Sequence, residues 1–560
     1  MAATLDKPLD ELRPPARAAT WPERLGPLAL YAVLSVLLFG LPVIGHLGSR
    51  IVAADPIDSS QFMWFFAWWP HALLHGLNPF VTHAMFVPSG FNLTWSTTMP
   101  GPSILLSPIT LAFGPAVTWN VIQLASPALS AWAMFLLCRH LTSRRWPSLA
   151  GGYLYGFSPY VLSHLTGGPY LALVPLPPLL VLLVLRRVEG TVGLRRFVIL
   201  MALGLTAQYS ISSEVLATGT FFGAIALVLG YALAPRSRRA LLGMLRPLAL
   251  AYAGMVVLIS PFLYFFFFGH QYPPGATGFR SDLVAFALPP AHVLLARQAP
   301  PIVASNTENY LGLPLIALLC AFAWQHRTSR RTQLLSLSLV IAAVLSLGPH
   351  LVVRGTKTSI PGPWLPFSHL PVLQYALPIR FGLFVLVPAA VMFALWLSEP
   401  TARNRAGVIR VGLAALTIAA IFPEVGSAAW NTPIKDPVFF SSGEYRHYLT
   451  HSDNVLTIPV WGPNERWEAD TGFYFKLSAG YAGNPFPGAY TRYPAWNTLL
   501  TGHLTSGYAA QLRRFVRAKS VTAIVVDETQ PGPWARLFGS LGVRPVSTGG
   551  VLFYRLRKPA

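Results

Sequence analysis

Charged residues are scarce in this sequence. Only 11% of its 560 residues are Asp, Glu, Lys or Arg, and 53% are hydrophobic, whereas a soluble domain is normally about a quarter charged. Two cysteines are too few for a disulfide framework or a zinc site. The sequence also has no glycine-rich phosphate loop and no nucleophile elbow. These absences exclude an ordinary soluble protein and predict a chain that lies largely within a membrane.

Apolar runs that approach or exceed the roughly 20 residues needed to cross a bilayer recur along the chain. They predict a membrane all-α domain over residues 27–422, preceded by a cytoplasmic tail over 1–26. About eleven transmembrane helices are predicted, at 27–47, 117–138, 147–163, 170–185, 197–210, 213–233, 247–268, 309–324, 333–349, 380–397 and 406–422.

Arginine clusters give the orientation of these spans. They occupy every second connection, for example Arg144 with Arg145 and Arg195 with Arg196. Because basic connections stay in the cytoplasm, the N-terminus is predicted to be cytoplasmic, and an odd number of spans places the C-terminus outside. The same clustering accounts for the net charge of +21, so nucleic-acid binding is not predicted. The predicted partners include membrane lipids.

Three outer connections are long: residues 48–116, 269–308 and 350–379. The first contains an aromatic segment over 61–75 that is too short to span a bilayer. This segment is predicted to be an interfacial helix in the headgroup plane, anchored by its tryptophans, Trp64, Trp68 and Trp69.

The composition becomes mixed after the last apolar run. Strands are predicted over 454–460, 521–526 and 550–554, and helices over 464–479 and 532–541. They predict a small extracytoplasmic α/β domain over residues 423–560, within the usual size of a domain. Glu468 and Asp470 are predicted to lie on a solvated helix face.

Acidic residues of the membrane part collect at the predicted outer ends of the spans, together with arginines. A carboxylate can take a proton from an acceptor hydroxyl, and arginine can hold a phosphate through two parallel hydrogen bonds. The combination suits a reaction on a lipid-linked phosphate. The residues concerned are Asp55, Asp58, Glu214, Asp282 and Glu308, with Arg354 and Arg380.

Several short segments, taken with this topology, carry a resemblance to a known family. They include Asp58-Ser-Ser-Gln61-Phe-Met-Trp64, Glu308-Asn-Tyr310-Leu-Gly-Leu-Pro314 and Leu377-Pro-Ile-Arg380-Phe381. The chain resembles the bacterial GT-C-like membrane glycosyltransferases, which use polyprenyl-phosphate sugars as donors. The resemblance implies a GT-C fold in the plasma membrane and a glycan or glycolipid acceptor of the cell envelope.

The resemblance also implies roles for individual residues. Asp58 is the expected general base of an inverting transfer, with Asp55, outside the matched run, as second choice. The topology, and not the resemblance, indicates the role of Arg380. It opens a span from the outer side, against the positive-inside bias, and is expected to hold the donor phosphate together with Arg354. Ser59 stands where some relatives have a second acidic residue, and no metal or cofactor is assigned.

Each of these residues also has a purely structural interpretation. Asp58 and Asp282 could cap helices, Glu214 and Glu308 could be solvated span ends, and Arg380 could extend to lipid headgroups. Two other functions stay open, namely a transporter or flippase of lipid-linked glycans and a non-catalytic envelope assembly factor. If the chain is an enzyme, Asp58, Asp282, Glu308 and Arg380 are expected to line one cavity.

Overall fold

The computed structural model describes residues 21–54, 56–272, 280–298, 308–370, 373–400, 405–483 and 486–556. The chain forms two compact units, which are described separately below. The first, called the helical unit, comprises Met1–Pro42, Ile122–Ile259 and Ala276–Trp430. The second, called the mixed unit, comprises Val43–Val121, Ser260–Gly275 and Asn431–Ala560.

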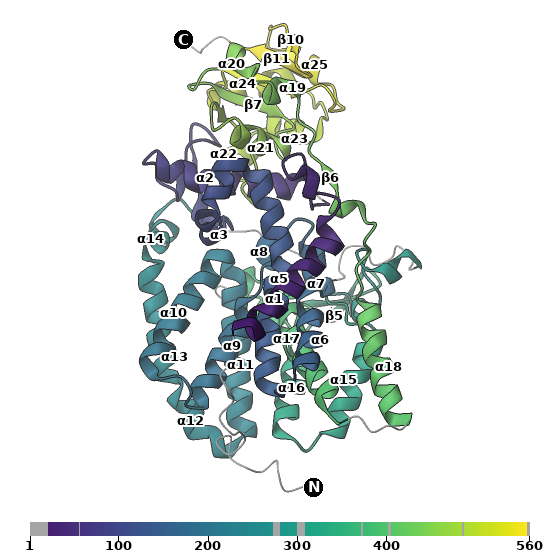
Figure 1. Cartoon of the computed structure of the whole chain (residues 1–560). Helices are drawn as coiled ribbons and strands as arrows, with labels where there is room; N and C mark the ends of the chain where they lie inside the picture. Colours follow the sequence, from purple (N-terminus) through teal and green to yellow (C-terminus); the bar gives the residue numbers. More distant parts are fainter. Residues whose placement is uncertain are drawn as a thin grey trace. The chain divides into compact units, whose positions relative to one another are not determined.

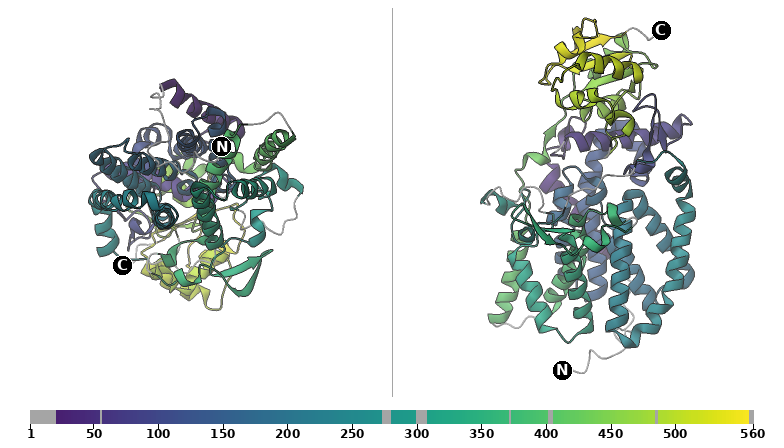
Figure 2. Two further views of the ribbon diagram at one scale, coloured as in Figure 1. Left: turned by 90° about the horizontal axis from the view of Figure 1, so that it is seen from below. Right: turned by 180° about the vertical axis from the view of Figure 1, so that it is seen from behind.

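The helical unit is a bundle in which α10, α11 and α13 lie side by side (Figure 1). The helices α6 and α5 are in close contact at Gly156, which has no Cβ atom. A Cβ atom added at Gly156 would lie 2.4 Å from the Pro127 carbonyl oxygen and would therefore clash with it. The helices are α1 (Trp21–Ser35), α5 (Pro115–Thr142, from Ile122 onward), α6 (Arg145–Gly156), α7 (Pro159–His164), α8 (Pro169–Ala172), α9 (Leu176–Val188), α10 (Leu194–Ile211), α11 (Ser213–Leu233), α12 (Arg238–Gly243), α13 (Leu245–Leu258), α15 (Leu313–Gln325), α16 (Arg330–Ser346), α17 (Gly382–Ser398) and α18 (Arg405–Ala420). Figure 2 shows the bundle from two further directions.

Five helical segments of the described residues are long and apolar enough to cross a membrane: Pro115–Thr142, Pro169–Val188, Ser213–Leu233, Pro235–Leu258 and Pro378–Ser398. Shorter apolar helices cover Leu25–Gly40, Leu313–Gln325 and Gly407–Ala420. A membrane location is therefore supported, while the number of eleven spans stays a prediction.

One predicted span is interrupted. The apolar run 247–268 forms α13, which ends at Leu258, and a separate helix, α14 (Ser260–Phe268). Pro261, which has no N–H to donate to the preceding turn, occupies the first turn of α14. Hydropathy alone could not show this break, because both pieces are apolar.

The mixed unit contains a five-stranded sheet in the order β10-β11-β9-β7-β8. β7 runs parallel to β8 and β9, whereas β11 is antiparallel to β9 and β10. The strands are β7 (Asn454–Ile458), β8 (Lys476–Leu477), β9 (Ala523–Asp527), β10 (Val546–Thr548) and β11 (Val551–Arg555). The C-terminal helices are α19 (Val438–Ser441), α20 (Tyr445–Tyr448), α21 (Pro463–Asp470), α22 (Gly488–Thr491), α23 (Pro494–Thr501), α24 (Tyr508–Ala518) and α25 (Trp534–Gly539).

The strands predicted from the sequence are present as β7, β9 and β11. The helix predicted over 464–479 is shorter than expected. It ends as α21 at Asp470, because Gly472 has a φ of +67° and the chain then enters β8.

Residues 43–121 fold together with the C-terminal residues in this unit. β1 (Arg50–Ile51) pairs with β6 (Thr432–Pro433), and Arg50 Nη1 donates to Asn431 Oδ1 over 2.7 Å. Asn120 donates to the carbonyls of Leu47 and Arg50 over 2.9 and 2.8 Å. The remaining elements are α2 (Pro56–Leu74), β2 (Val81–Thr82), β3 (Phe91–Asn92), α3 (Pro100–Leu105) and α4 (Ser107–Phe113).

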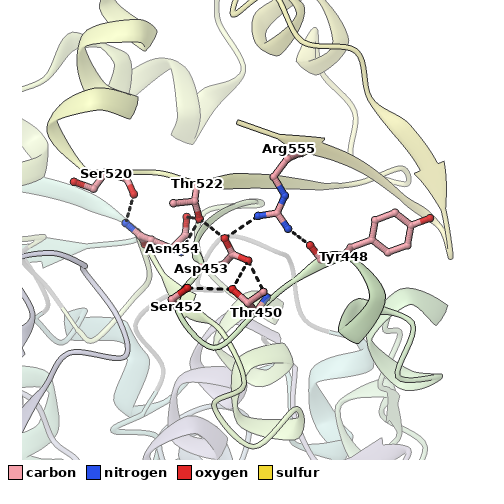
Figure 3. A network of polar contacts seen from close by, with 8 residues as sticks. All are labelled: Tyr448, Thr450, Ser452, Asp453, Asn454, Ser520, Thr522 and Arg555. Carbon is pink, nitrogen blue, oxygen red and sulfur yellow. Dashed lines mark hydrogen bonds and ion pairs between the residues drawn. The ribbon is translucent and has the colours of Figure 1, made fainter. Parts of the chain in front are cut away.

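Asp453 lies at the centre of a polar network next to the sheet (Figure 3). Its Oδ1 accepts from Thr522 Oγ1 and pairs with Arg555 Nη1, both at 2.7 Å. Its Oδ2 accepts from the backbone N–H of Thr450 at 2.8 Å. Burial raises the pKa of Asp453, but the hydrogen bonds from Thr522 and Thr450 and the charge of Arg555 outweigh this effect and lower it.

Asp453→Asn is expected to lower the free energy of unfolding at pH 7 by about 2 kcal/mol, because a buried charge-assisted network loses its anion. The lowered pKa means that this stabilisation is present above the ordinary value of 3.8 and is lost as the pH falls through the folded-state pKa. Thermal unfolding of the purified protein measures both effects. Glu528→Gln, at an exposed carboxylate of the same unit that accepts from Ser547, is the control. Equal losses in the two variants would contradict this role of Asp453.

Candidate functional site

Asp58 lies in the first turn of α2, which begins at Pro56. The residue is half-buried, and a carboxylate near a helix N-terminus is stabilised by the helix dipole. Asp58 is thus the third residue of the helix and does not occupy the capping position before it. Asp55, the second choice as base, lies outside the described residues.

The aromatic face of α2 is buried inside the mixed unit. Trp64, Trp68 and Trp69 are 0%, 3% and 4% exposed. The rings of Trp64 and Trp68 stack with centroids 5.3 Å apart, and Phe473 packs edge-on against both at 5.6 Å. The prediction that these tryptophans anchor an interfacial helix in the headgroup plane is therefore wrong, because protein and not lipid covers them.

Charged residues of α21 attach this helix to α2. Trp64 Nε1 donates to Glu468 Oε2 over 2.7 Å. Arg466, 3% exposed, pairs with Asp436 and donates to Ser60 Oγ over 3.4 Å. The prediction of a solvated face is wrong for Glu468, which is fully buried, while Asp470 is exposed. These contacts hold the turns of α2 that directly follow Asp58.

The two buried carboxyls of α21 are electrostatically unusual. Burial raises the pKa of Glu465 to about 8, although backbone N–H groups of Glu465, Tyr481 and Gly462 oppose the shift. Burial also raises the pKa of Glu468 well above its ordinary value, with the Trp64 indole opposing and the charge of Glu465 adding to the shift. Burial thus favours the protonated form of both carboxyls.

The raised pKa values predict that the mixed unit loses stability as the pH rises from about 4.5 to about 8. A carboxyl with a raised folded-state pKa stabilises the fold fully below its unfolded value, near 4.5, and this contribution is lost as the pH rises through about 8. The double variant Glu465→Gln/Glu468→Gln keeps neutral side chains and is expected to raise the Tm at pH 8.5 by about 5 °C. Thermal unfolding between pH 5 and pH 9 measures this, with Glu528→Gln at an exposed site as control. Identical pH profiles for wild type and double variant would contradict the assignment.

Arg380 and Glu214 form an ion pair in the helical unit. Arg380 belongs to the short helix Pro378–Phe381 that leads into α17, and Glu214 lies in the first turn of α11. Arg380 Nη1 contacts Glu214 Oε2, and the two side chains are 22% and 21% exposed. The Arg380 guanidinium carbon lies 5.5 Å from the ring centroid of Tyr170, a distance that allows a cation–π interaction.

Glu308 lies beside His164. Its Oε2 is 3.5 Å from His164 Nε2, and the His164 side chain is only 8% exposed. His164 Nδ1 is 2.7 Å from the Tyr160 carbonyl oxygen. Sequence reasoning missed His164, although its place just after a predicted span was a usable signal.

The carboxylate of Asp282 accepts a hydrogen bond from the backbone N–H of Arg354. Asp282, 1% exposed, accepts from the N–H groups of Val284, Arg354 and Gly355 at 3.0, 3.1 and 2.6 Å. It caps the short helix Leu283–Phe286 and holds the turn between β4 (His350–Val353) and β5 (Thr356–Pro361). The side chain of Arg354 is exposed.

The helical unit thus brings most of its predicted site residues together. Glu308 lies beside His164, and Glu214 pairs with Arg380. Asp282 is linked to this group through its neighbour Ser281, whose Oγ accepts from Asn309 Nδ2. Four polar atoms of this region are buried without a hydrogen-bond partner among the residues that the structure describes, namely Glu214 Oε1, Glu308 Oε2, Asn309 Oδ1 and the Tyr160 hydroxyl. Such atoms favour a polar ligand. Asp58 belongs to the mixed unit.

No family model and no curated protein matches the chain. Solved structures do match its fold. Arabinofuranosyltransferase AftD from Mycobacteria superposes with a TM-score of 0.57 and 14% identity, over 97% of this chain and 40% of that chain. The oligosaccharyltransferase AglB from Archaeoglobus fulgidus, solved with an inhibitory peptide and a dolichol-phosphate, superposes with a TM-score of 0.52 and 13% identity, over 96% of this chain and 74% of that chain.

The fold is that of the GT-C glycosyltransferases. The resemblance that the sequence motifs indicated is therefore confirmed for the fold. Because the identities are low, the similarity concerns the fold and not the substrates. The fold and the apolar helices together support a membrane location.

Proposed function

We propose that the chain is an inverting membrane glycosyltransferase that takes its sugar from a polyprenyl-phosphate donor. The acceptor is a glycan or glycolipid of the bacterial cell envelope, and transfer takes place on the outer face of the plasma membrane. The neighbour AglB was solved with a dolichol-phosphate, a lipid carrier of the same chemical class, which supports this choice of donor.

The observation that carries the proposal is the environment of Arg380. Its guanidinium is mostly buried at one end of the candidate span Pro378–Ser398, between Glu214 and Tyr170. Removing a charged group from water is unfavourable unless ion pairs or hydrogen bonds offset the lost hydration. Among the described residues, Arg380 pairs with one Glu214 oxygen, and a guanidinium has five N–H donors in all, which suits it to hold a phosphate as well. A fixed, partly dehydrated guanidinium is suited to stabilise a negative charge that grows during a reaction.

The proposed reaction has one displacement step. Asp58 removes the proton from an acceptor hydroxyl, and the oxygen attacks the anomeric carbon of the donor sugar. The bond between this carbon and the phosphate oxygen breaks, and polyprenyl phosphate leaves with the bonding electron pair. Arg380 stabilises the charge on the leaving phosphate. Attack from the face opposite the leaving group inverts the anomeric configuration.

The proposal is tested by incubating the purified full chain with a panel of polyprenyl-phosphate sugars and candidate acceptors, followed by product analysis. Release of polyprenyl phosphate that depends on both protein and acceptor supports it. The anomeric configuration of the product, determined by NMR, tests the inverting stereochemistry separately. Tight donor binding with no turnover across the panel would favour a lipid-glycan carrier instead.

A further inference from the structure

An unusual absence of acidic residues marks one part of the mixed unit. Residues 471–526 contain no Asp and no Glu, while arginine and lysine recur among them. Three of these arginines, Arg513, Arg514 and Arg517, lie on the helix α24 (Tyr508–Ala518). All three are exposed.

The opposite face of α24 is fixed inside the unit. Leu512 and Phe515 are 1% and 0% exposed. The Phe515 ring packs against Tyr493 and Trp496, with centroids 5.7 and 6.3 Å apart. The arginines therefore project from a helix whose position is set by its apolar face. Residues three or four positions apart lie next to each other on a helix, so the three side chains form one basic surface.

The positive charge of this surface is not neutralised within the described residues. Among the described residues, no carboxylate forms an ion pair with Arg513, Arg514 or Arg517. Arg513 donates there only to the Ser540 carbonyl, over 3.0 Å. Like charges at this spacing repel each other. A bound anion would relieve this repulsion.

A second basic pair lies at the C-terminal end of the same helix. Lys519 directly follows α24, and its ammonium lies 3.5 Å from the ring centroid of Tyr490. Burial, and then the charge of the neighbouring Arg492, lower the pKa of Lys519 to about 8. The Arg492 guanidinium lies over the Tyr493 ring at 5.5 Å. Basic side chains are thus concentrated around this helix, and none of the five forms an ion pair with a carboxylate in the described part of the chain.

The side chains indicate which kind of anion this surface suits. Helices that bind membrane surfaces direct large apolar residues into the lipid, whereas Leu512 and Phe515 of α24 are buried in protein. Among the residues of α24 there is no exposed large apolar side chain. Arginines match carboxylate and phosphate groups through paired hydrogen bonds, and several in a row match a polymer with repeated anionic groups.

We propose that α24 forms a binding surface for an anionic glycan, which is held by Arg513, Arg514 and Arg517. The surface is separate from the residues assigned to sugar transfer. Its affinity for an anionic polymer is inferred from α24 alone, whereas the choice of a glycan rests on the proposed function. Because α24 follows the last predicted span in the sequence, this polymer-binding surface lies outside the predicted spans.

The test is a binding measurement on the full chain in lipid nanodiscs. The probes are polygalacturonate, which carries a carboxylate on each sugar, and dextran, which is neutral. The variant Arg513→Gln/Arg514→Gln/Arg517→Gln is compared with wild type. Arg195→Gln/Arg196→Gln/Arg239→Gln, at three exposed arginines of the helical unit, is the matched control.

Wild type and the control are expected to bind polygalacturonate alike and dextran not at all. The α24 variant should bind polygalacturonate at least about tenfold more weakly, with a slope of log K against log salt reduced by about 2–3, as for other polyelectrolytes. An unchanged Tm shows that the variant is folded. Unchanged binding by the α24 variant, or an equal loss in the control, would overturn the proposal. So would α24-dependent binding to phosphatidylglycerol vesicles without binding to polygalacturonate.

Discussion

Asp58→Asn is expected to lower turnover by about a thousandfold, within the range for loss of a general base. Asparagine has nearly the same shape as aspartate but cannot accept the proton of the acceptor hydroxyl. Its effect on the fold is expected to be small, because a carboxylate near a helix N-terminus contributes at most about 1 kcal/mol at a partly exposed position. The measurement is kcat with a polyprenyl-phosphate sugar, together with the Tm of the purified variant.

A matched control is available in the same unit. Glu528→Gln removes the charge of an exposed carboxylate that accepts from Ser547, and it is expected to leave both kcat and Tm unchanged. Near-normal turnover by Asp58→Asn would show that Asp58 is not the base. The remaining candidates for the base would then be Asp55 and, in the helical unit, Glu308 and His164.

Arg380→Ala is expected to lower kcat through a loss of about 2–4 kcal/mol of transition-state stabilisation. The change in donor affinity is expected to be smaller. The reason is that the charge on the phosphate grows as the glycosidic bond breaks, so the guanidinium contributes more in the transition state than in the bound ground state. Arg380→Lys should restore activity only in part, because a lysine ammonium cannot replace the paired hydrogen bonds of arginine. Steady-state kinetics and a separate donor-binding measurement distinguish the two effects.

Glu214 allows a sharper version of this experiment. Removing Arg380 leaves the Glu214 carboxylate without its ion-pair partner, which could lower activity by disturbing the structure alone. The double variant Arg380→Ala/Glu214→Gln removes this uncompensated charge. If Arg380 only neutralises Glu214, the double variant regains activity; if Arg380 holds the donor phosphate, as proposed, it stays inactive. Equal losses of donor binding and turnover in Arg380→Ala would instead indicate headgroup recognition, as in a lipid-glycan carrier.

The sequence was sufficient for the features that depend on local pattern. Apolar runs located the helices of the bundle, and alternating or β-branched segments located β7, β9 and β11. The short motifs around Asp58, Glu308 and Arg380 indicated the GT-C fold, which the structural neighbours confirm. The pairing of Arg380 with Glu214 could not be seen, because the two residues are 166 positions apart, and hydropathy says nothing about which span ends meet.

The environment of α2 shows why the other errors arose. A run of aromatic residues suits both a lipid headgroup layer and a protein interior, and the sequence gives no means of choosing between them. The deciding partner is α21, whose own sequence, Pro463-Asn-Glu-Arg-Trp-Glu-Ala-Asp470, reads as a surface helix because of its charges. Glu468 and Arg466 are nevertheless buried, since Trp64, Ser60 and Asp436 supply their polar contacts. Only the folded contacts reveal this compensation.

The most direct test of the account follows both products of the proposed transfer in one reaction. Purified wild-type protein in nanodiscs is given a polyprenyl-phosphate sugar labelled in the sugar, with an envelope glycan or glycolipid as acceptor. If the proposed transfer takes place, labelled acceptor and free polyprenyl phosphate appear in equal amounts. Asp58→Asn and Arg380→Ala are each expected to prevent the formation of both products. Movement of the intact labelled donor across the bilayer, with no label in any acceptor, would contradict the proposal.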